Sequence, residues 1–151
     1  MNIPLIDRSN YLKGLFITAK LDKELSTKEK DILKKISDKL GFANDFFQES
    51  IRCLLTNNYI NEEPIIFSNE EIARSFLNDA LKLACANDLV TEAEIVWLKN
   101  TAKANNLNNK FIENELKSLE LSIFCIVTLH CEMKISPSLK NPVVNIKRVS
   151  S

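Results

Sequence analysis

Carboxylate and amide side chains gather at two short connections of the chain, and oxygen groups of this kind are the ligands that hard cations such as Ca²⁺ prefer. The second connection offers several such oxygens around one expected helix start, whereas the first offers fewer. Neither has the alternating ligands before a glycine that an EF-hand requires. The candidate ligands are therefore those of a weak cation site of another kind: Asn87, Asp88, Glu92 and Glu94 in the second connection, with Glu29 as the equivalent of Glu94 in the first.

Two of these carboxylates also have an ordinary structural role. Ser26 precedes Glu29 by three residues, and Thr91 precedes Glu94 by the same interval. This spacing is typical of a capping box, in which a hydroxyl and a carboxylate bind backbone N–H groups at the start of a helix. The sequence leaves two interpretations of the pair open: helix caps or cation ligands.

Residues that favour catalysis are sparse. His130 is the only histidine, and it lies between Cys125 and Cys131. Adjacent residues do not share a helix face, so His130 and Cys131 are badly placed for proton transfer. A Ser-His-Asp set, an HExxH motif and a glycine-rich phosphate loop are absent from the sequence. We therefore expect a protein that is not an enzyme, with reduced and buried thiols at Cys53, Cys85, Cys125 and Cys131.

The balance of charge excludes one class of partner. Twenty basic residues match twenty acidic ones, so no global positive field attracts a phosphate backbone, and no nucleic acid partner is expected. Residues 62–94 nevertheless hold eight acidic and two basic side chains, which indicates either solvated helix faces or a docking surface. Residues 1–10 lack the charged and apolar pattern of a signal peptide, and no apolar run reaches transmembrane length, so we expect a cytoplasmic location.

The pattern of residues 11–56 recurs in residues 76–121 at a constant offset of 65. Repeated units of this kind usually bury their apolar faces against each other. We therefore expect an all-α fold in which two helix-turn-helix pseudo-repeats pack into one helical bundle. The identities include Leu12 with Leu77, Ala19 with Ala84, Leu33 with Leu98, and Phe46 with Phe111.

Helical spacing of apolar residues predicts the elements of the first copy. A helix is expected from about residue 10 to 21, and a second from Ser26 to about residue 40, where Gly41 stops it. Asn44 is expected to cap a third helix. The buried side of this third helix is predicted to carry Phe46, Phe47, Ile51, Leu54 and Leu55.

The second copy repeats these steps with small changes. Asn106 replaces the glycine at the helix stop, and Trp97 and Phe111 are expected in the core rather than on a base-stacking platform. Between the copies, residues 57–67 are expected to be a loop whose apolar end enters the core. Ser68 with Glu71 then forms a third capping box, so the next helix is expected to begin near Asn69.

Residues 119–135 form an apolar segment after the second copy. Its run from 122 to 129 fits a buried helix or a strand, and the helical surroundings favour a terminal helix. One interpretation of this strip is the seam of a homodimer or of a partner interface. The tail from about 136 to 151 is expected to be extended. The whole chain, 1–151, is expected to be a single domain.

The repeated connection has the form small-Asp-x-x-apolar-Ser/Thr-x-x-Glu, and it occurs over residues 21–29 and 86–94. This doubled motif resembles the signature of TerB-like domains, the tellurite resistance protein B-like family, over roughly residues 10–121. The resemblance implies a non-enzymatic cytoplasmic domain that acts in stress response or in complexes at the membrane periphery. It also implies an acidic surface associated with divalent cations. The family's acidic position falls on Asp22 and Asn87, and its motif glutamates on Glu29 and Glu94.

Two functions follow as hypotheses. The first is a TerB-like binding or scaffold module, which uses the acidic surface around Asp88, Glu92 and Glu94 to bind a divalent cation such as Ca²⁺ or a basic partner. The second is a regulatory protein-interaction or dimerisation module without a metal, which uses residues 119–135 and the tail.

Overall fold

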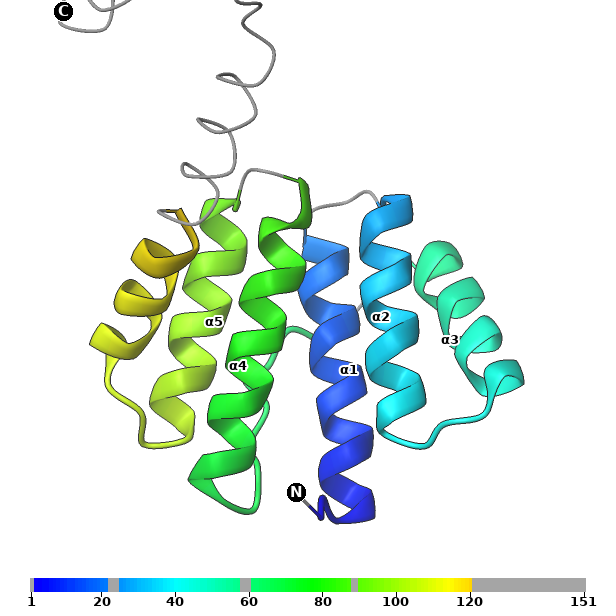
Figure 1. Ribbon diagram of the computed structural model, residues 1–151, viewed down its shortest axis with the longest axis horizontal. Helices are drawn as coiled ribbons and strands as arrows, with labels where there is room; N and C mark the ends of the chain where they lie inside the picture. Colours follow the sequence, from blue (N-terminus) through cyan, green and yellow to red (C-terminus); the bar gives the residue numbers. More distant parts are fainter. Residues whose placement is uncertain (1, 22–24, 58–60, 88–89, 121–151) are drawn as a thin grey trace, which may run out of the picture. The chain divides into compact units, whose positions relative to one another are not determined.

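The computed structural model describes residues 2–21, 25–57, 61–87 and 90–120. These residues form helices and the segments between them, as the sequence predicts. The helices are α1 (Leu5–Leu21), α2 (Thr27–Lys39), α3 (Asn44–Thr56), α4 (Glu70–Ala84), the 3₁₀ helix η1 (Cys85–Asn87), α5 (Glu92–Ala104) and a helix over residues 109–120 (Figure 1). None of the helices in these ranges is both long enough and apolar enough to cross a membrane.

The chain divides into two compact units, residues 1–116 and 117–151, and the hydrophobic core belongs to the first. The expected terminal helix and extended tail, from residue 121 onwards, lie outside the described residues.

Helices α2 and α5 begin with the predicted capping boxes. The Glu29 N–H donates to the Ser26 hydroxyl at 3.2 Å, and the Ser26 N–H donates to Glu29 Oε2 at 2.8 Å. Thr91 and Glu94 make the same pair of bonds at 3.2 and 2.7 Å. These bonds pair backbone donors that the first turn of a helix leaves without a partner.

The two helices also stop as predicted. Gly41 follows α2 with a φ of +84°, and Asn106 follows α5 with a φ of 60°. Both values lie in the left-handed region, which glycine adopts freely and asparagine tolerates. The next N–H group, of Phe42 or of Leu107, donates back to a carbonyl near the helix end, at 3.1 and 2.9 Å.

The start of α1 lies earlier than predicted, at Leu5 instead of near residue 10. The Arg8 N–H donates to the Pro4 carbonyl at 2.9 Å within this first turn. Leu5 and Ile6 are exposed, whereas Asp7 is buried. This reversal of the amphipathic pattern is the reason that apolar spacing did not reveal the turn.

Two predicted caps are wrong. The N-cap of α3 is Ala43, which makes no side-chain bond, and Asn44 is already helical. The N-cap of α4 is Asn69, whose side-chain oxygen accepts from the Ile72 N–H at 2.9 Å. The Ser68 hydroxyl instead donates to the buried Asp7 carboxylate of α1, so a tertiary contact replaces the expected local one.

Helices α1 and α4 lie side by side, flanked by α2 and α5 (Figure 1). Gly14 of α1 permits this close approach, because a Cβ atom at that position would lie 2.5 Å from Phe76 Cζ. The fully buried Phe76 ring also meets the Tyr11 ring edge to face, with the centroids 5.3 Å apart. A bare glycine and an aromatic ring thus set the distance between the two helices.

A polar contact fixes the same pair of helices. The Tyr11 hydroxyl donates to Asp79 Oδ2 at 2.5 Å and lies 3.2 Å from the Ser75 hydroxyl oxygen. Burial raises the pKa of the Tyr11 phenol well above its usual value, and the hydrogen bond to Asp79 raises it further. The phenol therefore remains a neutral hydrogen-bond donor throughout the physiological pH range.

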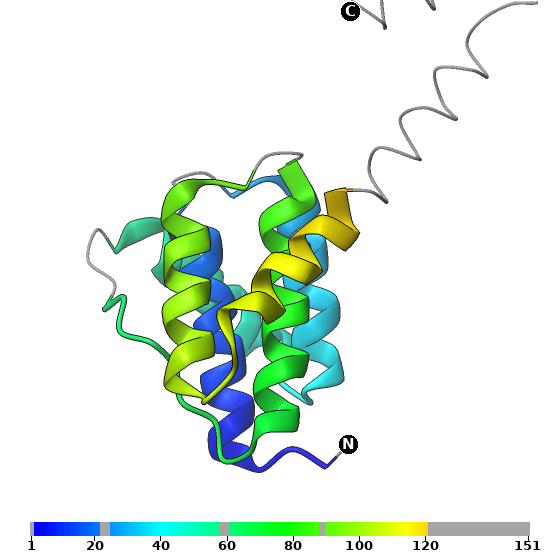
Figure 2. The ribbon, with the colours of Figure 1, turned by 90° about the vertical axis from the view of Figure 1, so that its left-hand side faces the viewer.

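The connecting segment 61–69 runs along the helices before α4 begins (Figure 2). Ile65 and Phe67 are buried and Ile66 is exposed, so the prediction that the apolar end of this loop enters the core is confirmed. Buried side chains satisfy its backbone. Asn105 accepts from the Phe67 N–H at 2.8 Å and donates to the Ile65 carbonyl at 2.7 Å, and Asp7 accepts from the Ser68 N–H at 3.0 Å.

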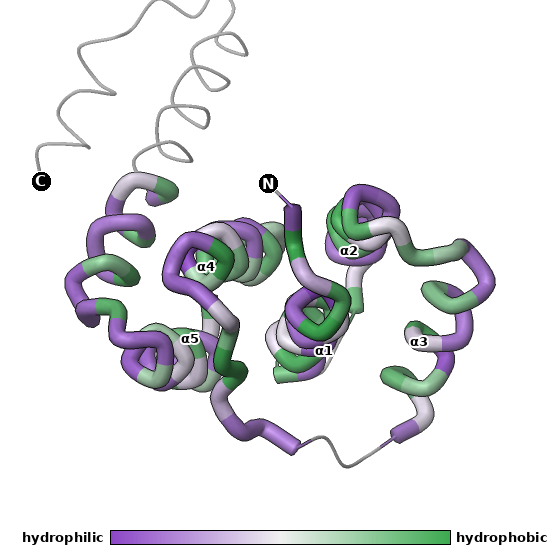
Figure 3. The backbone as a smooth tube through the Cα atoms, turned by 90° about the horizontal axis from the view of Figure 1, so that it is seen from below, coloured by the Kyte–Doolittle hydropathy of each residue, from purple (hydrophilic) through white to green (hydrophobic). Residues whose placement is uncertain are grey.

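Helix α3 buries a narrower face than predicted. Phe47, Ile51 and Leu54 are buried, but Phe46 and Leu55 are 52% and 54% exposed. The physical reason is that α3 packs more closely on α2 than on α1 (Figure 3), and an open groove separates part of it from α1. Two apolar side chains that the sequence assigned to the core therefore remain on the surface.

Candidate functional site

The motif glutamates of the predicted cation site occupy the helix starts. Glu29 and Glu94 are each 1% exposed. In addition to the N–H bonds, Glu29 Oε2 accepts from the Ser26 hydroxyl at 2.8 Å, and Glu94 Oε2 accepts from the Thr91 hydroxyl at 2.9 Å. Both carboxylates therefore complete capping boxes, in which they stabilise α2 and α5.

Of the other candidate ligands, the structure describes Glu92 and the backbone of Asn87. Glu92 is exposed at the start of α5, and Asn87 belongs to the short helix η1. Asp22 and Asp88 lie outside the described residues. Within the ranges that the structure describes, no group of three or more His, Cys, Asp or Glu side chains is arranged to hold a metal ion.

A substitution at Glu94 distinguishes a cap from a metal ligand. Glu94→Gln is expected to lower the free energy of unfolding by about 1 kcal/mol, because the helix start loses a charged acceptor. The loss should be equal with and without millimolar Ca²⁺ in chemical denaturation. A ligand would instead lose additional stabilisation when Ca²⁺ is present. Glu71→Gln is the matched control, because this exposed first-turn glutamate of α4 is not the N3 partner of a capping box.

A pocket of about 430 Å³ lies beside α5, where the acidic part of the sequence meets the end of α1. Most of its lining residues lie on one face of α5, where they follow Glu92 at intervals of one, four, five and eight residues. The remaining wall comes from the connecting segment and from α1. The residues that line this acidic pocket are Leu21, Glu62, Glu92, Ala93, Val96, Trp97 and Asn100.

Trp97 holds the connecting segment at the pocket. Its indole N–H donates to the Glu62 carbonyl at 2.9 Å, and its side chain is 5% exposed. Glu62 and Glu92 are exposed, and no Lys, Arg or His side chain is among the lining residues. Two carboxylates beside the edge of a tryptophan and aliphatic carbons form a site that favours a cationic group with an apolar stem.

Comparison with protein-family models, curated proteins and solved structures finds no match. A function for this chain must therefore be inferred from the arrangement of its side chains.

Sequence reasoning found part of this site. Glu92 was among the candidate ligands, and the acidic excess of residues 62–94 marked the region. The prediction that Trp97 lies in the core is confirmed. No sequence pattern indicated that the same side chain would also line a pocket. Glu62 lies thirty residues before Glu92 in the chain, so only the tertiary fold brings both of them to one pocket.

The thiols differ from prediction. Cys53 on α3 is exposed and Cys85 is half-buried. Cys53 lines an open groove between α1 and α3, so no neighbouring helix covers its thiol. Cys125, His130 and Cys131 lie outside the described residues, as does most of the predicted partner strip 119–135.

Proposed function

We propose that this chain is a non-enzymatic binding module of the TerB-like kind, built from two copies of one helical unit. The recurrence of local structure supports the two-copy arrangement. Helix α5 has the bounds of α2 moved by 65 residues, and both helices begin in a capping box and end at a left-handed residue. Tyr11 and Phe76, which are equivalent at this offset, contact each other between α1 and α4.

The acidic pocket is the binding site in this proposal, and a basic segment of a partner protein is its ligand. The observation that supports this proposal is that Glu62 and Glu92 line the same pocket as Trp97. A Lys or Arg side chain places its aliphatic stem on apolar surface and its charge near carboxylates. Ca²⁺ instead requires six to eight oxygen ligands, and only Glu62, Glu92 and Asn100 among the lining residues carry side-chain oxygens. The cytoplasmic, stress-related setting implied by the resemblance belongs to the same proposal.

The single tryptophan of the chain provides a direct test. Titration of the protein with a pentalysine peptide should change Trp97 fluorescence in a saturable way, and added salt should weaken binding. The Glu62→Gln, Glu92→Gln double variant should bind about three- to tenfold more weakly, because each partly exposed ion pair contributes little. Glu63→Gln is the matched control, because this exposed neighbour does not line the pocket.

Two outcomes would count against the proposal. Equal pentalysine affinity of the double variant and the wild type would place binding elsewhere on the surface. A fluorescence response to Ca²⁺ alone, lost in the double variant, would instead favour the divalent-cation version of the hypothesis. A pentaglutamate peptide should produce no response at any salt concentration.

A further inference from the structure

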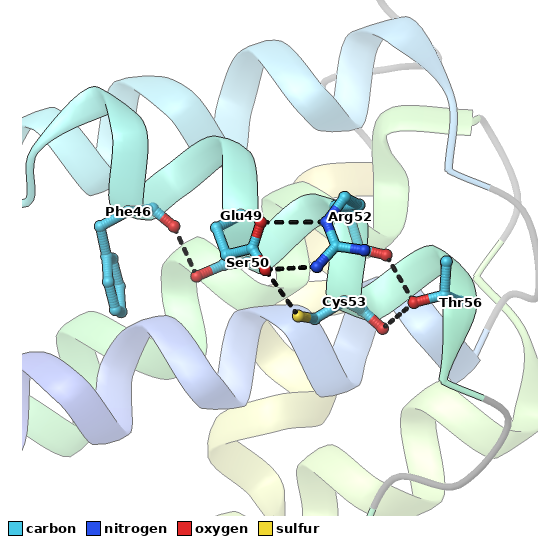
Figure 4. A network of polar contacts seen from close by, with 6 residues as sticks. All are labelled: Phe46, Glu49, Ser50, Arg52, Cys53 and Thr56. Carbon is cyan, nitrogen blue, oxygen red and sulfur yellow. Dashed lines mark hydrogen bonds and ion pairs between the residues drawn. The ribbon is translucent and has the colours of Figure 1, made fainter.

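A second cavity, of about 300 Å³, is an open groove between α1 and α3. Phe42, in the connection that follows α2, stacks on Phe46 with the ring centroids 5.1 Å apart and an interplanar angle of 20°. Phe46 is followed along α3 by Ser50 and Cys53, which also line the groove (Figure 4). The apolar wall on the α1 side is formed by Leu12, Phe16 and Ile17.

The corresponding aromatic ring of the second copy is covered. The guanidinium carbon of Arg74 lies 5.2 Å from the centre of the Phe111 ring, which is half-buried. At the offset of 65, Ser9 stands in place of Arg74 and Phe46 in place of Phe111. Ser9 lines the groove and is too short to cover a ring in this way, so Phe46 remains half exposed.

The groove carries positive charge. Lys13 is the only charged side chain among its lining residues. Lys20 donates to the Leu54 carbonyl at 2.9 Å and so joins α1 to α3 beside the groove. The Glu49 carboxylate accepts from the groove-lining Cys53 thiol at 3.7 Å and is held by Arg52, with Nη2 to Oε1 at 2.5 Å (Figure 4). The hydrogen bond from Arg52 lowers the pKa of Glu49. An anionic head group is therefore the complementary one.

The dimensions of the groove decide what kind of ligand fits. Its lining runs from Ser9 to Ile17 on α1 and from Phe46 on α3 to the C-cap residue Asn57, which corresponds to about 12 and 16 Å along the helices. A volume of about 300 Å³ is at the lower end of the range for small-molecule pockets. An extended alkyl chain suits a groove of this length and volume, whereas an α-helix with its side chains is about 10–12 Å across. We propose that the groove binds a single fatty acid of medium length, such as dodecanoate, with its carboxylate at Lys13.

Cys53 reports occupancy of the groove in the full chain. Alkylation of each thiol by N-ethylmaleimide can be followed by peptide mass analysis, with Cys85 as an internal reference that does not line the groove. Dodecanoate, kept below its micelle concentration, should slow modification of Cys53 at least tenfold at saturation and leave Cys85 unchanged. Affinity from calorimetry should rise about fourfold per methylene from octanoate to dodecanoate.

Ser9→Arg is the decisive variant, because it places over Phe46 the side chain that already covers Phe111. It should weaken dodecanoate binding at least tenfold, and Lys13→Gln should weaken it by about threefold to tenfold. Arg74→Ser is the matched control and should bind as the wild type does. Circular dichroism and thermal melting of each variant establish that the fold is intact.

Several results would overturn the proposal. These are equal binding by the Ser9→Arg variant, an affinity independent of chain length, or equally tight binding of dodecyltrimethylammonium. Protection of Cys53 by an amphipathic helical peptide but not by dodecanoate would identify a protein ligand instead. The pentalysine response at the acidic pocket is independent of all these outcomes, so each proposal can fail without the other.

Discussion

Replacement of Phe76 by alanine is expected to lower the free energy of unfolding by about 3–5 kcal/mol, the largest effect of any substitution considered for this chain. The ring is fully buried and contacts the rings of Tyr11, Phe67 and Trp97, with centroids 5.0–6.2 Å away. Its removal leaves a cavity that several helices must collapse to fill. Urea denaturation followed by circular dichroism measures the loss.

A double-mutant cycle with Gly14 tests the close approach of α1 and α4. Gly14→Ala in the wild type should cost about 1–3 kcal/mol, although alanine is the better helix former, because the new Cβ overlaps the Phe76 ring. The cost should largely disappear when Phe76 is leucine. Additive free energies in the two variants would contradict the contact and would place the constraint on Gly14 elsewhere.

Replacement of Asn105 by alanine is expected to be the second-largest loss, about 2–4 kcal/mol. The buried amide of Asn105 accepts from the Phe67 N–H and donates to the carbonyls of Ile65 and Thr101, at 2.7–2.8 Å. Alanine leaves these backbone groups buried without their partner, which costs more than the loss of an exposed hydrogen bond. Equilibrium unfolding in urea gives the value.

The neighbouring Asn106 offers a control of opposite sign. Its φ of 60° is strained for a side chain but free for glycine, so Asn106→Gly should raise the stability by up to about 1 kcal/mol. If Asn105→Ala cost no more than a typical surface change of about 0.5 kcal/mol, the proposed anchoring of the connecting segment would be wrong.

The features that the sequence predicted best are those governed by local rules. The capping boxes at Ser26 and Thr91 and the left-handed stops at Gly41 and Asn106 each depend on a few neighbouring residues. Such residues choose their partners within one helical turn. Local spacing was therefore sufficient to place the bounds of α2 and α5 almost to the residue.

The wrong predictions share a different cause. Ser68 binds Asp7, which is 61 residues away, so a capping box that was plausible locally does not form. Phe46 follows the apolar spacing of α3, but periodicity does not reveal how wide a face a neighbouring helix covers. Both errors concern contacts between elements that are distant in the chain.

The candidate sites also combine a local feature that the sequence reveals with contacts between distant elements that it does not. The acidic character of residues 62–94 was visible in the sequence, but the pocket that joins Glu62 to Trp97 was not. The groove lies between α1 and α3, which are joined by the Lys20 bond to the Leu54 carbonyl and by the Phe16 and Phe47 rings, with centroids 6.4 Å apart. No motif describes such a space between two helices.

The absence of a side chain at Gly14 affects whether a ligand in the groove can alter binding at the acidic pocket. Helix α1 lines the groove with residues 9–17 and reaches the acidic pocket at Leu21. The Phe76 ring occupies the space beside Gly14, so α1 cannot slide or turn without displacing the central aromatic cluster. The helix is therefore expected to act as a rigid wall shared by the two proposed sites, with no second register that either ligand could select. Occupancy of one proposed site is then expected to leave the affinity of the other unchanged.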